Sequence, residues 1–342
     1  MLSPRAAAVL ESTVSQYIVT AAPVPSQSIM NEHRLGVSSA TIRNELARLE
    51  QEGYIIRPHP SAGSVPSDKG YRYYVESLSN IELPLGEQRL ISHQFHQVEK
   101  QLEEWLRLTA TLMAQLVQNL AVVTVPKPNS CRFKHLELVA LQDLLALIVL
   151  ILHGAKVRQQ LITFDQIMSQ PGLTAIANKL NAEYSGLTRE QVLAKTMELS
   201  PTEQQITDCL LKTMQDEDEQ KYEEPYLDGL HFMLNQPEFA HTRQMLKLME
   251  LVEQRKLLST ILPPKQEGRR VQVFIGKENK EEAIHDYSVV LSQYGLPEEA
   301  TGTIGIIGPT RMPYARTIST IEYLSSVLNE LVAELYGKEP AG

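Results

Sequence analysis

Apolar residues in the first 35 positions recur at the three- and four-residue spacing of helices. Pro4 begins the first such segment, which continues to Ile18 and ends before two closely spaced prolines. A second segment begins at Ser26, a residue that can cap a helix, and runs to about His33. The pattern therefore predicts two short amphipathic helices at the start of the chain.

A third helix is predicted from Ser39 to Glu52, after a tight turn at Gly36 and with Ser38 as its cap. Two helices joined by a short glycine turn are typical of proteins that place the second helix in the major groove of DNA. One face of this helix has apolar residues at spacing i, i+4, i+7 and is expected to point into the core. These residues are Ile42, Leu46 and Leu49.

The opposite face of the third helix carries side chains suited to reading bases. Arginine can donate two hydrogen bonds to guanine, asparagine can pair with the adenine edge, and alanine lets the helix approach closely. An ordinary solvated helix would show a similar pattern, but the turn before it and the segment after it favour DNA binding. That face holds Ala40, Arg43, Asn44, Ala47, Arg48 and Gln51. The predicted DNA contacts on this helix are Ala40, Arg43, Asn44 and Arg48 from that face, together with Ser39 and Thr41 at the start of the helix.

The segment after the third helix predicts a β-hairpin. An extended apolar stretch begins at Tyr54, passes through a tip rich in proline, serine and glycine, and returns toward three tyrosines at positions 71, 73 and 74. Cationic and hydroxyl side chains on such a hairpin can contact backbone phosphates, which fix position without specifying sequence. The predicted phosphate contacts are Arg57, His59, Ser61, Lys69 and Arg72.

Beyond residue 80 the pattern predicts a helical segment and then three strands. Leu85 to Val123 is helical in pattern, and three strands follow at Lys134–Leu141, Leu144–Leu152 and Lys156–Phe164. Their links are so short that only antiparallel pairing is plausible. The middle strand is continuously apolar, as a strand buried on both faces would be.

The second half of the chain is helical first and mixed later. Helices are predicted at 172–184, 189–197, 201–215, 225–234 and from Pro237 to Leu262, strands at Val271–Gly276, Tyr287–Tyr294 and Thr303–Ile307, and a closing helix at Ile318–Tyr336. The simplest account is a multidomain α+β protein. Its expected parts are a DNA-binding domain at 1–80, an α+β domain at 81–165 and 237–342, and a mostly helical insertion at 166–236.

Charge and composition restrict where nucleic acid can bind. The 342 residues include 32 basic and 41 acidic ones, a net charge of −9. Residues 1–75 hold seven basic and six acidic side chains and so carry +1, which leaves −10 for the remainder. DNA contact is therefore expected only near the N-terminus. Two distant cysteines, no signal-peptide pattern and no apolar run near the ~20 residues that span a bilayer predict a cytoplasmic protein without membrane contact.

Catalytic and cofactor motifs give no positive signal. Gly302, Gly305 and Gly308 follow a GxxGxxG spacing without GK[ST], so glycines in a packed strand are favoured over a phosphate loop. His93 and His96 lie three residues apart on a predicted helix but lack a recognisable full set of metal ligands. We expect no enzyme, no cofactor and no metal site.

Five sequence blocks, in order and well separated, carry a family resemblance. They are Ser39–Leu46, Ser61–Gly63 continuing through Asp68–Arg72, Asn235–Phe239, Ile275–Asn279 and Gly308–Met312. Together they resemble the HrcA family of heat-inducible transcription repressors. The chain departs from that family at Ser64, where an arginine is usual in the wing, and at Pro313, where an aspartate is usual. The first departure removes one expected phosphate or minor-groove contact.

The resemblance implies a winged helix-turn-helix, a GAF-like domain and an inserted dimerisation domain. It also implies a homodimer that binds an inverted-repeat operator of double-stranded DNA in front of chaperone operons, and a GroEL chaperonin that keeps the repressor active until heat relieves repression. A second hypothesis is a winged-helix regulator that responds to a metabolite bound in the GAF-like pocket.

Overall fold

The chain consists of two compact units. The computed structural model describes residues 2–32, 38–59, 62–79, 81–99, 101–127, 131–153, 157–219, 224–240, 246, 249–250, 271–296 and 300–336. The first unit, called the main unit here, comprises Met1–Pro126, Glu224–Leu296 and Thr301–Gly342. The second, called the inserted unit, comprises Lys127–Glu223 with Pro297–Ala300.

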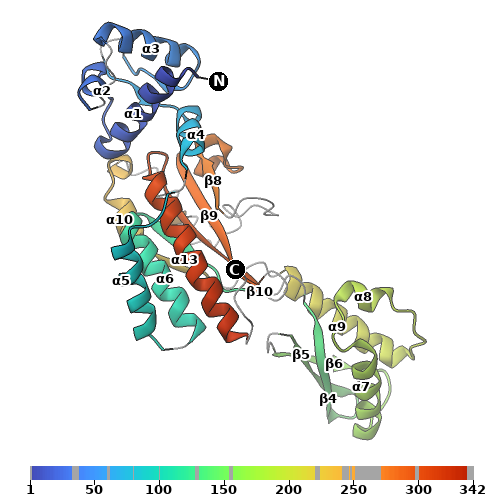
Figure 1. The fold of residues 1–342 in the computed structure, drawn as a ribbon. Coiled ribbons are helices and arrows are strands. Elements are labelled where there is room, and N and C mark those ends of the chain that lie inside the picture. Colours follow the sequence, from blue (N-terminus) through green and yellow to red (C-terminus); the bar gives the residue numbers. More distant parts are fainter. Residues whose placement is uncertain are drawn as a thin grey trace. The chain divides into compact units, whose positions relative to one another are not determined.

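The main unit begins with the predicted helices. They are α1 (Pro4–Thr20), α2 (Ser26–Glu32) and α3 (Ser39–Gln51), followed by β1 (Ile55–Ile56), β2 (Val65–Pro66) and α4 (Asp68–Ser77) (Figure 1). The Ser38 hydroxyl accepts the Thr41 amide and so caps α3, as expected. The expected turn at Gly36 lies outside the described residues.

The hairpin is shorter than the sequence suggested. β1 and β2 pair antiparallel, Ile55 opposite Pro66 and Ile56 opposite Val65, which confirms a hairpin. The expectation that its return strand leads into the tyrosines at 71, 73 and 74 is wrong, because these residues lie on α4. Ser67 caps that helix by accepting the Gly70 amide, which ends the extended segment at residue 66.

A five-stranded sheet forms the rest of the main unit. Its strand order is β7-β3-β10-β9-β8, with β3 at Leu120–Val123, β7 at Tyr226–Asp228, β8 at Val271–Ile275, β9 at Tyr287–Leu296 and β10 at Ala300–Pro309. Helices α5 (Leu85–Gln97), α6 (Leu102–Val117) and α13 (Tyr314–Leu335) accompany it, and α13 packs on β9 and α6 (Figure 1).

Two helical predictions are wrong in this part of the chain. The span from Leu85 to Val123 is two helices and a strand, because all four residues of β3 are buried in the sheet. The expected helix at 225–234 is β7 followed by α10 (Leu230–Leu234). After η1 (Pro237–Ala240), most of the expected helix up to Leu262 lies outside the described residues.

The inserted unit is a three-stranded sheet backed by helices. The strands β4 (Phe133–Gln142), β5 (Leu145–Leu152) and β6 (Val157–Thr163) pair antiparallel in that order, as predicted. Helices α7 (Gln170–Tyr184), α8 (Arg189–Ala194) and α9 (Pro201–Glu219) follow. This unit starts near residue 127, earlier than the expected 166, because apolar residues of its strands share one core with α7 and α9.

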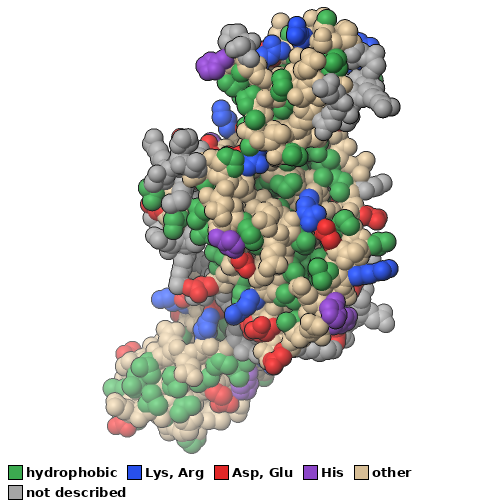
Figure 2. All heavy atoms as spheres, turned by 90° about the vertical axis from the view of Figure 1, so that its left-hand side faces the viewer, with side chains coloured by type: hydrophobic (Ala, Val, Ile, Leu, Met, Phe, Trp, Pro, Cys, Tyr) green, Lys and Arg blue, Asp and Glu red, His purple; other side chains and the backbone are tan. Residues whose placement is uncertain are grey.

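The expected burial of β5 on both faces is wrong. Its residues alternate between buried and half-buried, so the inner face packs on helices while the outer face is partly open. Val139, Leu147 and Leu161 are cross-strand neighbours on that outer face. Val139 is 42% exposed and Leu161 is 58% exposed. Figure 2 shows this side as a gathering of hydrophobic side chains on the lower part of the molecule.

Candidate nucleic-acid interface

Helix α3 is held in place by its inner face. Ile42, Leu46 and Leu49 are 0%, 2% and 0% exposed, and α3 packs against α1 and α2. Burial of three branched apolar side chains fixes which way the helix is turned. Because successive residues are 100° apart around a helix, the burial of these three residues also determines which residues of α3 face solvent.

The outer face presents Arg43 and Asn44 to solvent. Both side chains are exposed, and among the described residues neither takes part in a hydrogen bond or ion pair. Figure 2 shows Lys and Arg side chains on the upper end of the molecule, where the N-terminal helices lie. An exposed arginine next to an exposed asparagine can reach base edges without first breaking internal bonds.

The other predicted residues of α3 are more constrained. Arg48 is exposed but pairs with Glu52, one turn further on, with 2.7 Å between Nε and Oε1. The Thr41 hydroxyl lies 3.0 Å from that of Ser38 and forms part of the cap. Ser39 is half-buried and Ala40 is exposed at the start of the helix.

Two cations of the hairpin region lie close to the C-terminal end of α3. Lys69 donates from Nζ to the Glu52 carbonyl at 2.8 Å and lies 4.2 Å above the ring of Tyr54. Arg57 is 3.5 Å from the Glu50 carboxylate. A cation is favourable at this end of a helix. His59 is exposed on the same segment, and Ser61 lies outside the described residues.

Arg72 is placed differently from the other predicted phosphate contacts. Its guanidinium donates to the Glu278 carboxylate and to the Val273 carbonyl, both on the five-stranded side of the main unit. The bond to Glu278 raises the pKa of Arg72 above its ordinary value. This pairing could not be predicted from the sequence, because the partners are 206 residues apart.

Ser64, where the family usually has arginine, is buried. Its backbone exchanges two hydrogen bonds with Val24, of 2.8 and 2.9 Å, which tie the hairpin to the segment between α1 and α2. A side chain on Gly63 would collide with the backbone of Pro23, so this approach requires glycine. The hairpin is thus held where its loop joins β2.

The glycine-rich segment serves packing. Gly302, Gly305 and Gly308 all lie in β10, and a Cβ at each would collide with Tyr294, Leu291 or Asn119 respectively. This agrees with glycines in a packed strand. In the described parts of the chain, no helix has the length and apolar character needed to cross a bilayer.

The described elements define a multidomain α+β protein that presents an exposed helix near its N-terminus. Residues 103–318 match the family model described as the HrcA protein C terminal domain. A curated relative from Dehalococcoides mccartyi, named heat-inducible transcription repressor HrcA, is 57% identical over 342 residues, covering 100% of this chain and 99% of the relative. A relative of the same name from Roseiflexus castenholzii is 40% identical over 347 residues, covering 99% and 96%.

The chain belongs to the HrcA family of transcription repressors. The family predicted from sequence is therefore confirmed, and it is a repressor family rather than an enzyme family. The metabolite-responsive alternative is not favoured. A crystal structure titled only as a hypothetical protein has the same fold, with a TM-score of 0.59, 23% identity and coverage of 98% of this chain and 99% of that one.

Proposed function

We propose that this repressor is a cytoplasmic homodimer that reads an inverted-repeat operator through α3. Residues 1–80 form the winged helix-turn-helix, with α3 as its recognition helix and the β1–β2 hairpin as its wing. The observation that carries the proposal is the pair Arg43 and Asn44, exposed and unbonded among the described residues on a helix whose other face is buried. Ser39, Ala40, Thr41 and Arg48 border that pair and complete the proposed contact surface.

The test of this proposal is selection of bound duplexes from random DNA by the full-length protein. A dimer with two recognition helices related by a two-fold axis selects an inverted repeat. Recovery of sequences with no shared motif contradicts the proposal.

Phosphate contacts are proposed for Arg57, His59, Ser61 and Lys69 around the wing. Arg57 and Lys69 lie near the end of α3, so a duplex against that helix brings phosphates within their reach. Arg72 is left out of this proposed set because its guanidinium is bonded to Glu278 and Val273.

Replacing Arg57 with alanine is expected to weaken binding to all duplexes alike. The loss of one phosphate contact per subunit lowers the slope of log affinity against log salt by about 0.9 per contact, about 1.8 for a dimer. Fluorescence anisotropy across a salt series measures this. Arg89→Ala, an exposed arginine on α5, is the matched control and should leave the slope unchanged. A loss restricted to operator DNA contradicts the assignment.

The dimer contact is proposed on the outer face of β4–β6. The sequence led us to expect an apolar dimer surface at 166–236. In the described part of the same unit, a row of open apolar residues lies on the sheet that precedes those helices. Exposed apolar rows on a sheet favour contact with a partner. A second copy of the chain is the partner that an inverted repeat requires.

The five-stranded sheet with α5, α6 and α13 is proposed as the GAF-like domain.

GroEL is proposed as the regulator of the fraction of repressor that can bind DNA. Folded proteins are stable by only ~5–15 kcal/mol, so modest heating lowers the DNA-competent population, and a chaperone that refolds the protein restores it. GroEL with ATP is expected to raise operator occupancy in a reconstituted gel-shift assay after mild heating. GroEL without ATP is the control, and equal occupancy with and without ATP contradicts this regulation.

A further inference from the structure

Four of the five blocks that carry the family resemblance meet at one place in the main unit. They are Asp68–Arg72 on α4, Asn235–Phe239, Ile275–Asn279 and Gly308–Met312. The meeting place is the junction between residues 1–80 and the five-stranded domain. The proposed DNA contacts do not account for three of these blocks, so the junction calls for a role of its own.

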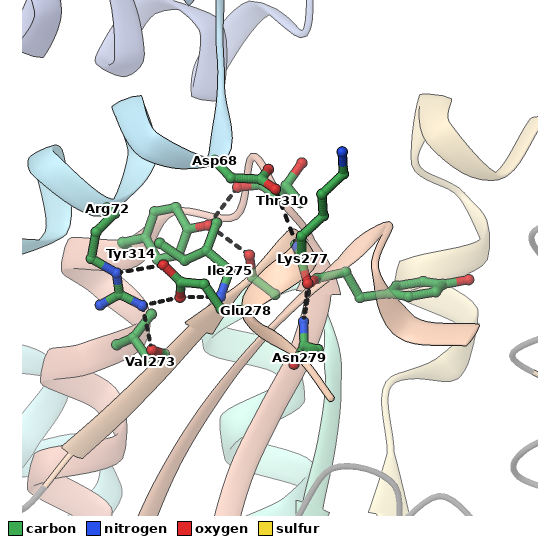
Figure 3. Close-up of polar contacts among 12 residues, drawn as sticks. Asp68, Arg72, Val273, Ile275, Lys277, Glu278, Asn279, Thr310 and Tyr314 are labelled. Carbon is green, nitrogen blue, oxygen red and sulfur yellow. Dashed lines mark hydrogen bonds and ion pairs between the residues drawn. The ribbon is translucent and has the colours of Figure 1, made fainter. Parts of the chain in front are cut away.

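The first contact of the junction fixes α4. Arg72 donates to both oxygens of the Glu278 carboxylate, with 2.8 Å between Nε and Oε1, and its Nη2 also donates to the Val273 carbonyl at 2.6 Å (Figure 3). The same carboxylate accepts the Ile275 amide at 2.9 Å, which holds it in line with the guanidinium. A bidentate arginine–carboxylate ion pair is strong and directional.

A second bond to α4 comes from the turn after β8. The Asp68 carboxylate accepts the Lys277 amide at 3.1 Å (Figure 3). Gly276 has φ +53 and no room for a side chain, because a Cβ there would collide with that carboxylate. The positive φ and this close approach to α4 both favour glycine at this position.

The third contact fixes α1. Arg311, whose side chain is 15% exposed, donates from Nη1 to the Ile18 carbonyl at 3.1 Å in the last turn of α1. It also pairs with Glu238 and donates to Gln236 at 3.4 Å. The cation lies at the favourable end of the helix dipole.

Apolar packing fills the space between these polar contacts. Tyr71 of α4 is 2% exposed and its ring centre lies 5.8 Å from that of Tyr314 at the start of α13. Tyr314 is fully buried and bonds to Ser288 and Thr310. Buried residues from both sides of the junction belong to one continuous core. Since α1 packs on α3, the junction also determines where α3 points.

We propose that Asp68, Arg72, Glu238, Glu278 and Arg311 are positioning residues for operator binding. They hold α3 in one orientation on the five-stranded domain, so that the two recognition helices of a dimer meet half-sites at a single spacing. This inference rests on the proposed function, a dimer on an inverted repeat. Each base pair added between the half-sites rotates one half-site about the DNA axis by about a tenth of a turn relative to the other. A rigid junction keeps the recognition helix from following this rotation, whereas a loosened junction lets the helix follow it.

Operators whose central spacer differs by single base pairs test this proposal. The full-length wild type is expected to bind one spacing well and its neighbours about tenfold or more worse. Glu278→Gln removes the charge that holds Arg72. It is expected to reduce the ratio of affinities between the preferred spacing and its neighbours by about fivefold or more. Its affinity for a duplex with one half-site stays the same, because no base contact is altered. The matched control is Glu87→Gln, which weakens a similar pair with Arg316 inside the five-stranded domain and leaves the spacing preference intact.

The outcomes separate this inference from the proposal on which it rests. A wild type that binds an inverted repeat no better than a single half-site contradicts the proposed dimer on an inverted repeat. A wild type that binds the repeat equally well at every spacing overturns the positioning role and leaves the dimer standing. A sharp wild-type preference that Glu278→Gln retains overturns the positioning role, and so does an equal loss on the single half-site and on every spacer, which marks a purely structural pair. If Glu278→Gln does not fold, Arg72→Lys is the second variant, because it keeps the positive charge but not the bidentate hydrogen bonding. Its spacing preference is measured and interpreted in the same way.

Discussion

Replacing Arg43 with alanine is expected to remove most of the preference for operator over random DNA. A bidentate arginine–guanine contact is worth about 1–3 kcal/mol, and a symmetric dimer makes it twice, so the loss is about 2–6 kcal/mol, or ~30-fold at the least. Asn44→Ala is expected to act in the same way at an adenine. Both side chains are exposed, so neither change removes buried contacts that stabilise the fold.

Competition gel shifts against random duplex measure this loss. Arg89→Ala, on α5 and also exposed, is the matched control and keeps the operator preference. An unchanged preference in both the Arg43 and the Asn44 variants refutes the assignment of α3 as the base-reading helix.

Replacing Leu161 with aspartate is expected to give a monomer that binds the operator on the order of 1000-fold more weakly. The charge would lie at the β6 end of the apolar row on β4–β6, at its most exposed residue of the three, where a second subunit would bury it. A monomer engages one half-site only, and specific affinities of about 10⁻⁸–10⁻¹¹ M depend on both. Sedimentation at micromolar concentration and gel shifts give the two readouts.

The matched control for the dimer prediction is Leu193→Asp. Leu193 lies on α8 of the same unit, is 56% exposed against 58% for Leu161, and is not part of the sheet. It is expected to leave the dimer intact. A Leu161→Asp protein that remains dimeric contradicts the proposed interface.

Local signals in the sequence were sufficient for the N-terminal helices. A serine cap, a proline near the helix start and apolar residues one turn apart predicted α1 and α3, and Ile42, Leu46 and Leu49 are buried as expected. These signals work because they depend on neighbours within four residues. The exposed positions of Arg43 and Asn44 follow from the same spacing.

Features that depend on distant partners could not be predicted. Leu120–Val123 is too short an apolar run for periodicity to separate a strand from a helix end, and its burial in a sheet depends on β10 and β7. The bond between Arg72 and Glu278 could not be predicted either, because the two residues are 206 positions apart in the sequence. The uninterrupted apolar sequence of β5 gave no sign that only one of its faces is covered by helices.

The most direct measurement is a parallel selection from random DNA by the wild type and by the Arg43→Ala/Asn44→Ala double variant. The wild type is predicted to enrich an inverted repeat, while the variant, which keeps its proposed wing contacts to phosphates, binds DNA without enriching those base pairs. If the double variant enriches the same repeat as the wild type, helix α3 does not read the operator.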